Sequence, residues 1–338
     1  MRLPCCLFVA LAVIGVTGRS LHDRHGQLFS RDELVAKCRL SLFLTLEDPE
    51  GSGSKKRDLF HHGNETLVRR MRLPTDPDDP DIVEAYVIKE TGGGPFPGKK
   101  SDESKLIHWQ NRYKEGVNTA DYKIFAERKT KFGMHIIGLA GCTGLLIVSK
   151  KGVYMAHYWE NIAFNQDKKT PRPYPDQEQA FEGTVIRGLE QGVVGDPARG
   201  AKQEQASLRA VAPALDDEDI HAFLIIPATG QSDVGLGIPD PYRTYWSRIK
   251  NTVGEILPRL KPKTDPTDTD LWTEYPYRPV EDEEEEPGKA PWLWRSSRGR
   301  ILFKYDPNHR RADGTKVKKT FVAIENEVKD EGSFEWND

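Results

Sequence analysis

Cysteine is scarce in this chain, with 4 in 338 residues. That number excludes a small disulfide-dense scaffold and a zinc cluster built from several cysteines. Neither sign of charge is in excess either, because 49 Lys and Arg residues face 52 Asp and Glu residues. A nucleic-acid-binding protein needs surplus basic side chains to neutralise phosphates, so we expect no nucleic acid among the partners.

The glycine motifs of nucleotide-dependent enzymes are missing as well. Neither Gly-x-Gly-x-x-Gly nor the P-loop motif occurs, and the Gly-x-Ser-x-Gly motif of serine hydrolases is also absent. His61 and His62 are adjacent, but no further ligands stand at metal-binding spacing around them. We therefore expect neither a cofactor nor a bound metal.

Long apolar runs are confined to the N-terminus. Arg2 precedes an apolar stretch over 5–16, and small residues follow at 16–18, as in a secretory signal peptide. A membrane anchor is the alternative, but the stretch is short, and no later segment approaches the ~20 apolar residues that cross a bilayer. We expect residues 1–18 to be removed and the protein to be secreted and extracellular, without stable membrane insertion.

Removal of the signal peptide leaves two cysteines, Cys38 and Cys142, which could form one disulfide in an oxidising compartment. Between them, Asn64 begins an Asn-Glu-Thr glycosylation sequence, which predicts an exposed loop and a glycoprotein. The basic cluster at 55–57 follows a Gly/Ser stretch, and it is either a processing site or an ordinary solvated cluster. Residues 19–75 are accordingly predicted to be a pro-segment or a disordered linker.

Residues 76–338 are predicted to form one catalytic-type domain. Five prolines between 262 and 287, with an acidic run at 281–286, predict a disordered insertion over 261–291 that stays outside the core. Irregular alternation of strands and helices favours an α+β fold with a central, mostly antiparallel sheet or sandwich and flanking helices. Strands are expected at 83–88, 144–148, 153–159, 222–226, 300–305 and 320–324. Helices are expected at 101–113, 176–189 and 242–260.

A cysteine among small residues begins the predicted hairpin, in the segment Gly-Leu-Ala-Gly-Cys-Thr-Gly at 138–144. His157 stands on the next strand, fifteen residues after Cys142. A cysteine hydrolase needs a thiolate, an imidazole to hold its proton and donors for the oxyanion. The glycines would let a substrate carbonyl approach the backbone. The amides of Cys142 or its neighbours would form the oxyanion hole, and those neighbours are Gly141, Thr143 and Gly144.

The hairpin register decides whether the cysteine and the histidine meet. If residues 149–152 form a four-residue loop, Gly144 lies opposite His157. Cys142 and His157 are then diagonal neighbours on one face, with Cβ atoms about 7–8 Å apart. A three-residue loop with a glycine bulge would shift the register by one and turn His157 to the other face.

These residues resemble the active site of the cytotoxic necrotizing factor toxins. Residues 139–142 read Leu-Ala-Gly-Cys, similar to their Leu-Ser-Gly-Cys signature, and Thr143 and the fifteen-residue gap to His157 also match. The resemblance implies the deamidase-like core of these toxins, of Burkholderia lethal factor and of the chemotaxis deamidase CheD. It further implies a toxin- or effector-like hydrolase that deamidates a target glutamine in a protein substrate. Cys142 would be the nucleophile and His157 the base.

Other interpretations stay open at this point. The third catalytic group is not identified, because Ile136 stands where some relatives carry a Thr and a backbone carbonyl could serve instead. Cys142 could also be an inert core side chain, or be bonded to Cys38. The protein would then be a non-enzymatic secreted binder. Its expected contact elements are the acidic run at 281–286 with Trp272, Trp292 and Trp294.

Overall fold

The computed structural model describes residues 71, 73–92, 104–106, 118–165, 174–193, 205–228, 242–263, 270–277 and 296–337. It also describes the two-residue strands β1 (Leu21–His22) and β2 (Leu28–Phe29). Several features predicted from the sequence lie outside the described residues: the predicted signal peptide, Cys38, Asn64, the basic cluster at 55–57 and the acidic run at 281–286. Within the described part of the chain, no helix has the length and apolar character needed to cross a membrane.

Two mostly antiparallel sheets and several helices confirm the predicted α+β fold. The first sheet has the order β4-β7-β6-β8-β9 and the second the order β12-β11-β10-β5-β3, with β13 also paired to β11. Among the strands that the structure describes, β8–β9 and β3–β5 are the pairs that run parallel. The prediction of a helix over 101–113 is wrong for 104–106, which form the strand β3. The first sheet comprises β4 (Thr119–Ile124), β6 (Thr143–Val148), β7 (Gly152–Tyr158), β8 (His221–Pro227) and β9 (Trp272–Tyr277). The second comprises β3 (Ser104–Leu106), β5 (Phe132–Ile136), β10 (Ile301–Arg310), β11 (Lys316–Ile324), β12 (Glu327–Val328) and β13 (Glu335–Trp336).

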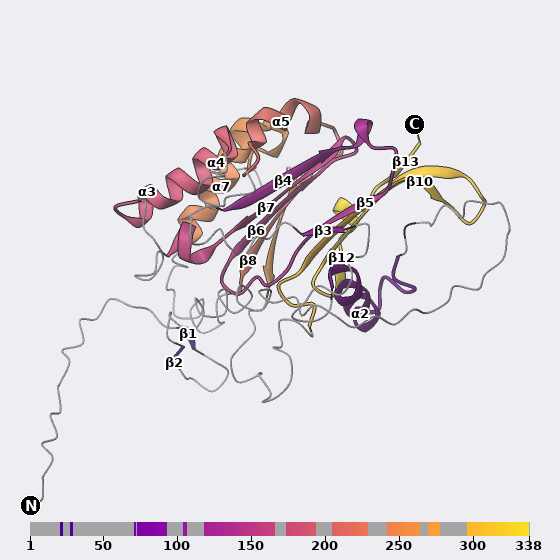
Figure 1. Cartoon of the computed structure of the whole chain (residues 1–338), viewed down its shortest axis with the longest axis horizontal. Coiled ribbons are helices and arrows are strands. Elements are labelled where there is room, and N and C mark those ends of the chain that lie inside the picture. Colours follow the sequence, from indigo (N-terminus) through magenta and orange to yellow (C-terminus); the bar gives the residue numbers. More distant parts are fainter. Residues whose placement is uncertain are drawn as a thin grey trace, which may run out of the picture.

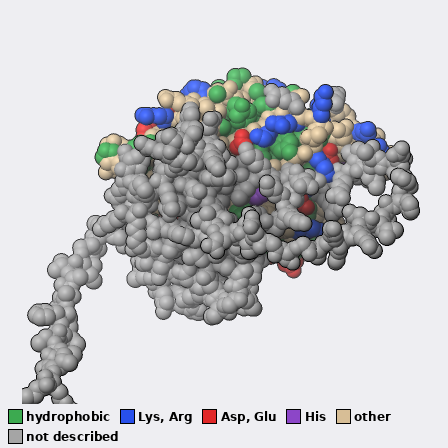
Figure 2. All heavy atoms as spheres, in the orientation of Figure 1, with side chains coloured by type: hydrophobic (Ala, Val, Ile, Leu, Met, Phe, Trp, Pro, Cys, Tyr) green, Lys and Arg blue, Asp and Glu red, His purple; other side chains and the backbone are tan. Residues whose placement is uncertain are grey.

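Figure 1 shows the elements stacked in layers, with most helices over the first sheet and α2 (Pro80–Thr91) beyond the second sheet. The covering helices are α3 (Gln177–Phe181), α4 (Arg187–Gln191), α5 (Leu208–Leu215) and α7 (Arg243–Ile256). A π-helical turn over Glu182–Ile186 joins α3 to α4. On the described part of the face in Figure 2, Lys and Arg side chains are scattered among neutral ones instead of forming one stripe.

Three hydrophobic clusters lie between these layers. The cluster under the helices includes Leu145, Tyr154 and Trp246. The cluster between the two sheets includes Cys142 and Met155. The third cluster lies between the second sheet and α2. Alternate residues of β6 and β7 therefore enter different clusters, as the two-residue period of a strand requires.

The predicted strand at 83–88 is wrong, because these residues belong to helix α2. Asp79 caps the helix, its carboxylate accepting from the amides of Asp81 and Ile82, and Pro80 occupies the first turn. The buried residues Val83 and Val87 are four apart, so one helical face enters the core. This helical spacing is hard to recognise because other apolar residues stand between Val83 and Val87. The signal for a helix start is the pair Asp79 and Pro80.

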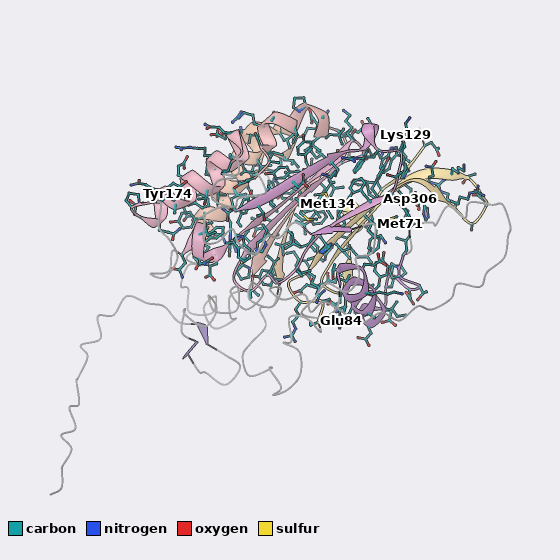
Figure 3. All side chains as sticks on the ribbon, in the orientation of Figure 1. Met71, Glu84, Lys129, Met134, Tyr174 and Asp306 are labelled. Carbon is teal, nitrogen blue, oxygen red and sulfur yellow. The ribbon has the colours of Figure 1, made fainter. Side chains whose placement is uncertain are left out.

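The folded domain begins earlier than the predicted boundary at residue 76. Met71 is buried in the cluster beneath α2. Its amide donates to the carboxylate of Asp306 at 2.9 Å, and the two labelled residues lie close together in Figure 3. Asp306 lies at a bulge inside β10, where the pairing with β11 shifts between Asp306 and His309.

The prediction that 261–291 stays outside the core is wrong for β9. This strand pairs with β8 over its whole length, from Ala222 opposite Trp272 to Pro227 opposite Tyr277. Tyr277 is fully buried, and the Trp272 indole donates to the carbonyl of Leu260 at 2.6 Å. Pro276 is tolerated because β9 is an edge strand. Proline content alone therefore does not distinguish a disordered segment from an edge strand.

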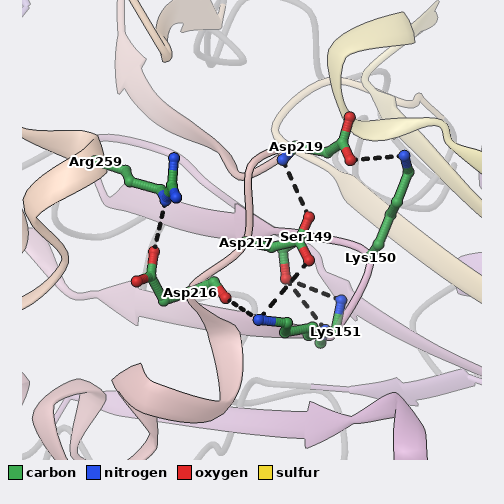
Figure 4. Close-up of polar contacts among 8 residues, drawn as sticks. Ser149, Lys150, Lys151, Asp216, Asp217, Asp219 and Arg259 are labelled. Carbon is green, nitrogen blue, oxygen red and sulfur yellow. Dashed lines mark hydrogen bonds and ion pairs between the residues drawn. The ribbon is translucent and has the colours of Figure 1, made fainter.

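The turn between β6 and β7 is tied to the segment before β8 (Figure 4). Lys150 forms an ion pair with Asp219 at 2.6 Å, and the Lys151 ammonium donates to the carbonyl of Asp216. The Ser149 amide donates to the Gly152 carbonyl at 2.9 Å. These contacts hold the loop in the length that pairs Val148 with Val153, which is the first of the two predicted registers.

Candidate active site

The hairpin brings Cys142 and His157 to the same face of the first sheet. Gly144 lies directly opposite His157, and Leu146 lies opposite Met155. Continuing this alternation, Cys142 stands one position before β6, level with Trp159 and diagonal to His157. Cys142, Leu146, Met155 and Trp159 all belong to the cluster between the sheets, as the predicted register requires. Diagonal neighbours of this kind have Cβ atoms about 7–8 Å apart.

The imidazole of His157 has a defined neighbour on each side. Its ring stacks on Trp159, with ring centroids 4.4 Å apart and planes inclined by 22°. Thr119 on β4 lies directly opposite His157, so its side chain shares the face of the imidazole. Gly144 occupies the equivalent position on β6. His157 is therefore flanked by a hydroxyl-bearing residue on one strand and by a glycine on the other.

The space above Gly144 is filled in this structure. A Cβ atom at Gly144 would lie 2.7 Å from Cδ1 of Ile301, which reaches over from the second sheet. The predicted clearance over this glycine thus serves the packing of the two sheets. Cys142 and His157 are both fully buried.

The loop before Cys142 is held from two directions. The Leu139 amide donates to the Gly299 carbonyl at 3.1 Å. The hydroxyl of Tyr277 accepts from the Gly141 amide at 2.7 Å and donates to the Cys142 carbonyl at 2.9 Å. The Gly141 amide, one of the predicted oxyanion donors, is therefore engaged within the protein.

Gly141 is required at its position for two reasons. Its φ of +104° lies in the left-handed half of the map, where side chains are strained. A Cβ atom there would also overlap the carboxylate of Glu160, which is buried beside the loop. The other carboxylate oxygen of Glu160 accepts from the Tyr242 hydroxyl at 2.6 Å. A buried acid thus lies against the residue that precedes Cys142.

Thr143 faces away from the imidazole. Its hydroxyl accepts from the indole of Trp246 at 3.1 Å, on the side of the sheet that α7 covers. Its side chain therefore anchors α7 to the hairpin. A role in the oxyanion hole would be limited to its backbone.

A second buried acid supports the loop from the second sheet. The carboxylate of Glu325 accepts from the Gly299 amide at 2.8 Å and from the Tyr275 hydroxyl at 3.3 Å. Burial raises the pKa of Glu325 above its usual range, and it also raises the pKa of Tyr275. Because Gly299 in turn accepts from Leu139, Glu325 supports the segment that leads to Cys142.

Cys142 is fully buried. Cys38, its partner in the alternative disulfide, lies outside the described residues, so that alternative stays a prediction. Trp272, one of the tryptophans expected at a binding surface, is instead buried, and its indole donates to the Leu260 carbonyl. Trp292 and Trp294 lie outside the described residues.

The sequence pattern gives no signal for Tyr277, Thr119 or Glu160. Tyr277 lies in the segment predicted to be a disordered insertion, and Thr119 comes near His157 only through the pairing of β4 with β7. Glu160 is the third residue after His157, a position that carries no motif. Among the residues that the structure describes, no group of three or more His, Cys, Asp or Glu side chains could hold a metal ion.

Compared with known proteins, the chain matches no model of a protein family, and no curated protein matches it. The resemblance to the necrotizing factor toxins therefore rests on the hairpin residues alone.

Proposed function

We propose that this protein is a secreted cysteine amidohydrolase that deamidates glutamine side chains in a protein substrate. The observation that supports the proposal best is the hairpin register. It sets Cys142 and His157 on one face as diagonal neighbours, and a one-residue slip would separate them. The same two residues carry the resemblance to the necrotizing factor toxins.

The proposed reaction has two steps. The Cys142 thiolate attacks the carboxamide carbon, and the tetrahedral intermediate collapses to a thioester as ammonia leaves. His157 as imidazolium supplies the proton that ammonia carries away, and then as imidazole takes a proton from the attacking water. Hydrolysis of the thioester leaves glutamate and restores the thiol. Backbone amides near Cys142, excluding that of Gly141, would stabilise the oxyanion.

We assign Thr119 as the group that orients His157. The two residues are directly opposite on antiparallel strands, where Cβ atoms are about 4.5–5.5 Å apart. A hydrogen bond between this hydroxyl and the imidazole would fix which ring nitrogen faces the sulfur. Thr119 is itself buried, so its side chain is shielded from water.

Burial of the pair has a consequence for the substrate. A carboxamide reaches the sulfur only when a neighbouring segment moves, because neither Cys142 nor His157 has exposed surface. Exclusion of water in turn strengthens the electrostatic interactions within the site.

The proposal is tested by measuring the conversion of glutamine to glutamate in a substrate. The purified protein is incubated with a denatured casein and with benzyloxycarbonyl-glutaminylglycine, and conversion of amide to acid is followed by mass spectrometry. We expect conversion by the wild-type protein and none by Cys142→Ser. Equal conversion by the two proteins would exclude Cys142 as the nucleophile.

A further inference from the structure

We propose that Tyr277 is a positioning residue for Cys142, a role that rests on the function proposed above. Tyr277 is fully buried and comes from β9, 135 residues along the chain from the cysteine. Its hydroxyl forms hydrogen bonds to two backbone groups of the loop, the Gly141 amide and the Cys142 carbonyl. Those groups stand on either side of the peptide bond that joins the two residues.

A single oxygen thus fixes the backbone from which the Cys142 side chain projects. This support matters because Cys142 stands just before β6, where the regular ladder to β7 begins at Thr143. The preceding Gly141 has a left-handed φ, which the ladder could not impose. The hydrogen bonds of Tyr277 therefore hold the backbone at Cys142, where the pairing of β6 with β7 has not begun.

Removal of this hydroxyl would leave a buried amide and a buried carbonyl without their partner. Such groups are costly, so the loop would rearrange to recover hydrogen bonds. Rearrangement would move the sulfur relative to His157, and a displacement of about 1 Å can cost about 10²-fold in rate. The expected effect is on the chemical step, with little change in substrate binding.

The test compares Tyr277→Phe with Tyr154→Phe. Tyr154 lies on β7 and points to the opposite face, where its hydroxyl donates to the Ala206 carbonyl at 3.0 Å. Each substitution removes one buried phenolic hydroxyl that bonds to the backbone, so both should lower the unfolding temperature. The readouts are the rate of Cys142 alkylation by iodoacetamide, and kcat and KM for benzyloxycarbonyl-glutaminylglycine.

We expect Tyr277→Phe to lower the alkylation rate and kcat by about tenfold or more, with KM changed less than about twofold. Tyr154→Phe should leave all three within about twofold of wild type. Wild-type rates in folded Tyr277→Phe would overturn the assignment. If alkylation depends on His157 but the two Phe variants behave alike, only the role of Tyr277 fails. If alkylation is independent of His157, the proposed function fails instead.

A second measurement needs no variant. Hydrogen exchange of the Gly141 amide in the wild-type protein should be slow, because this amide donates to a buried hydroxyl. Exchange as fast as that of an exposed loop amide would show that Tyr277 does not hold the loop. This result would overturn the assignment even if Tyr277→Phe fails to fold.

Discussion

Thr119 and His157 lie directly opposite each other on β4 and β7, and the imidazole stacks on Trp159. His157 thus has a hydroxyl-bearing neighbour on β4 and an aromatic neighbour just after the end of β7. In the proposed mechanism, these two neighbours would hold the imidazole in one orientation, which a proton-transferring residue needs.

If Thr119 orients His157, its hydroxyl is the feature that matters. Thr119→Val keeps the shape of the side chain and removes the hydroxyl, so we expect about 10-fold to 100-fold lower amide hydrolysis with the fold intact. Thr119→Ser keeps the hydroxyl and should retain most of the activity. Steady-state kinetics of the two variants make the comparison, and equal losses in both would show that packing, not hydrogen bonding, is the contribution of Thr119.

Gly141→Ala should destabilise the loop before Cys142. The left-handed φ alone costs about 1–3 kcal/mol for a residue with a side chain, and the added methyl would also displace the Glu160 carboxylate. Gly314 is a matched control, because its φ is +86° but no atom lies within 4 Å of a Cβ placed there. Urea unfolding of the two alanine variants separates the cost of the left-handed φ from the cost of the overlap with Glu160. If both lose the same stability, contact with Glu160 adds nothing.

β9 should contribute to stability through Trp272. This side chain is buried and is bonded to the Leu260 carbonyl, so Trp272→Ala should cost about 3–5 kcal/mol. Tyr122 is the control, because its side chain is exposed and Tyr122→Ala should cost less than about 0.5 kcal/mol. Thermal unfolding monitored by circular dichroism gives both values. If both variants lose similarly little unfolding free energy, residues 270–277 are loosely attached, as their proline content predicts.

His221 should make stability depend on pH. Burial lowers the pKa of His221, whose Nε2 lies 2.9 Å from the Thr273 hydroxyl on β9. The unfolded chain then binds a proton more readily than the folded one, so this contribution is complete above about pH 6.5 and is lost as the pH falls towards the lower folded pKa. His221→Gln should weaken the decline in unfolding free energy between pH 7 and pH 5. An unchanged slope would show that His221 titrates alike in both states.

The sequence predicted the hairpin well because its information is local. Two β-rich segments and a Ser-Lys-Lys-Gly turn define the strands, and the Val148–Val153 pairing follows from the loop length. The helix that begins near Asp176 also follows from its capping residue and apolar spacing, and the helix that begins near Tyr242 follows from apolar spacing. The sequence allows two loop lengths and therefore two hairpin registers. In the structure, contacts of Lys150 and Lys151 with the segment before β8 hold the four-residue loop.

Contacts between distant segments could not be predicted in the same way. Tyr277 approaches Cys142 only because β8 and β9 pair in parallel, which requires the intervening helix α7 to cross over the sheet. Thr119 reaches His157 through the β4–β7 pairing, which no spacing in the chain specifies. The sequence predicts a strand where helix α2 forms, because a short run of nearly consecutive apolar residues occurs in both strands and buried helices.

The rate at which iodoacetamide modifies Cys142 between pH 5 and pH 9 decides whether the cysteine and the histidine act as a pair. If His157 takes the proton of the thiol as the proposed base, the wild-type protein should be alkylated faster at neutral pH than a variant without the imidazole. His157→Gln should react more slowly at neutral pH, by about tenfold or more, and should regain rate only at high pH. Burial of Cys142 slows both proteins alike, so their ratio is informative even if both rates are low. Superimposable pH profiles from two folded proteins would contradict catalysis by Cys142 and His157.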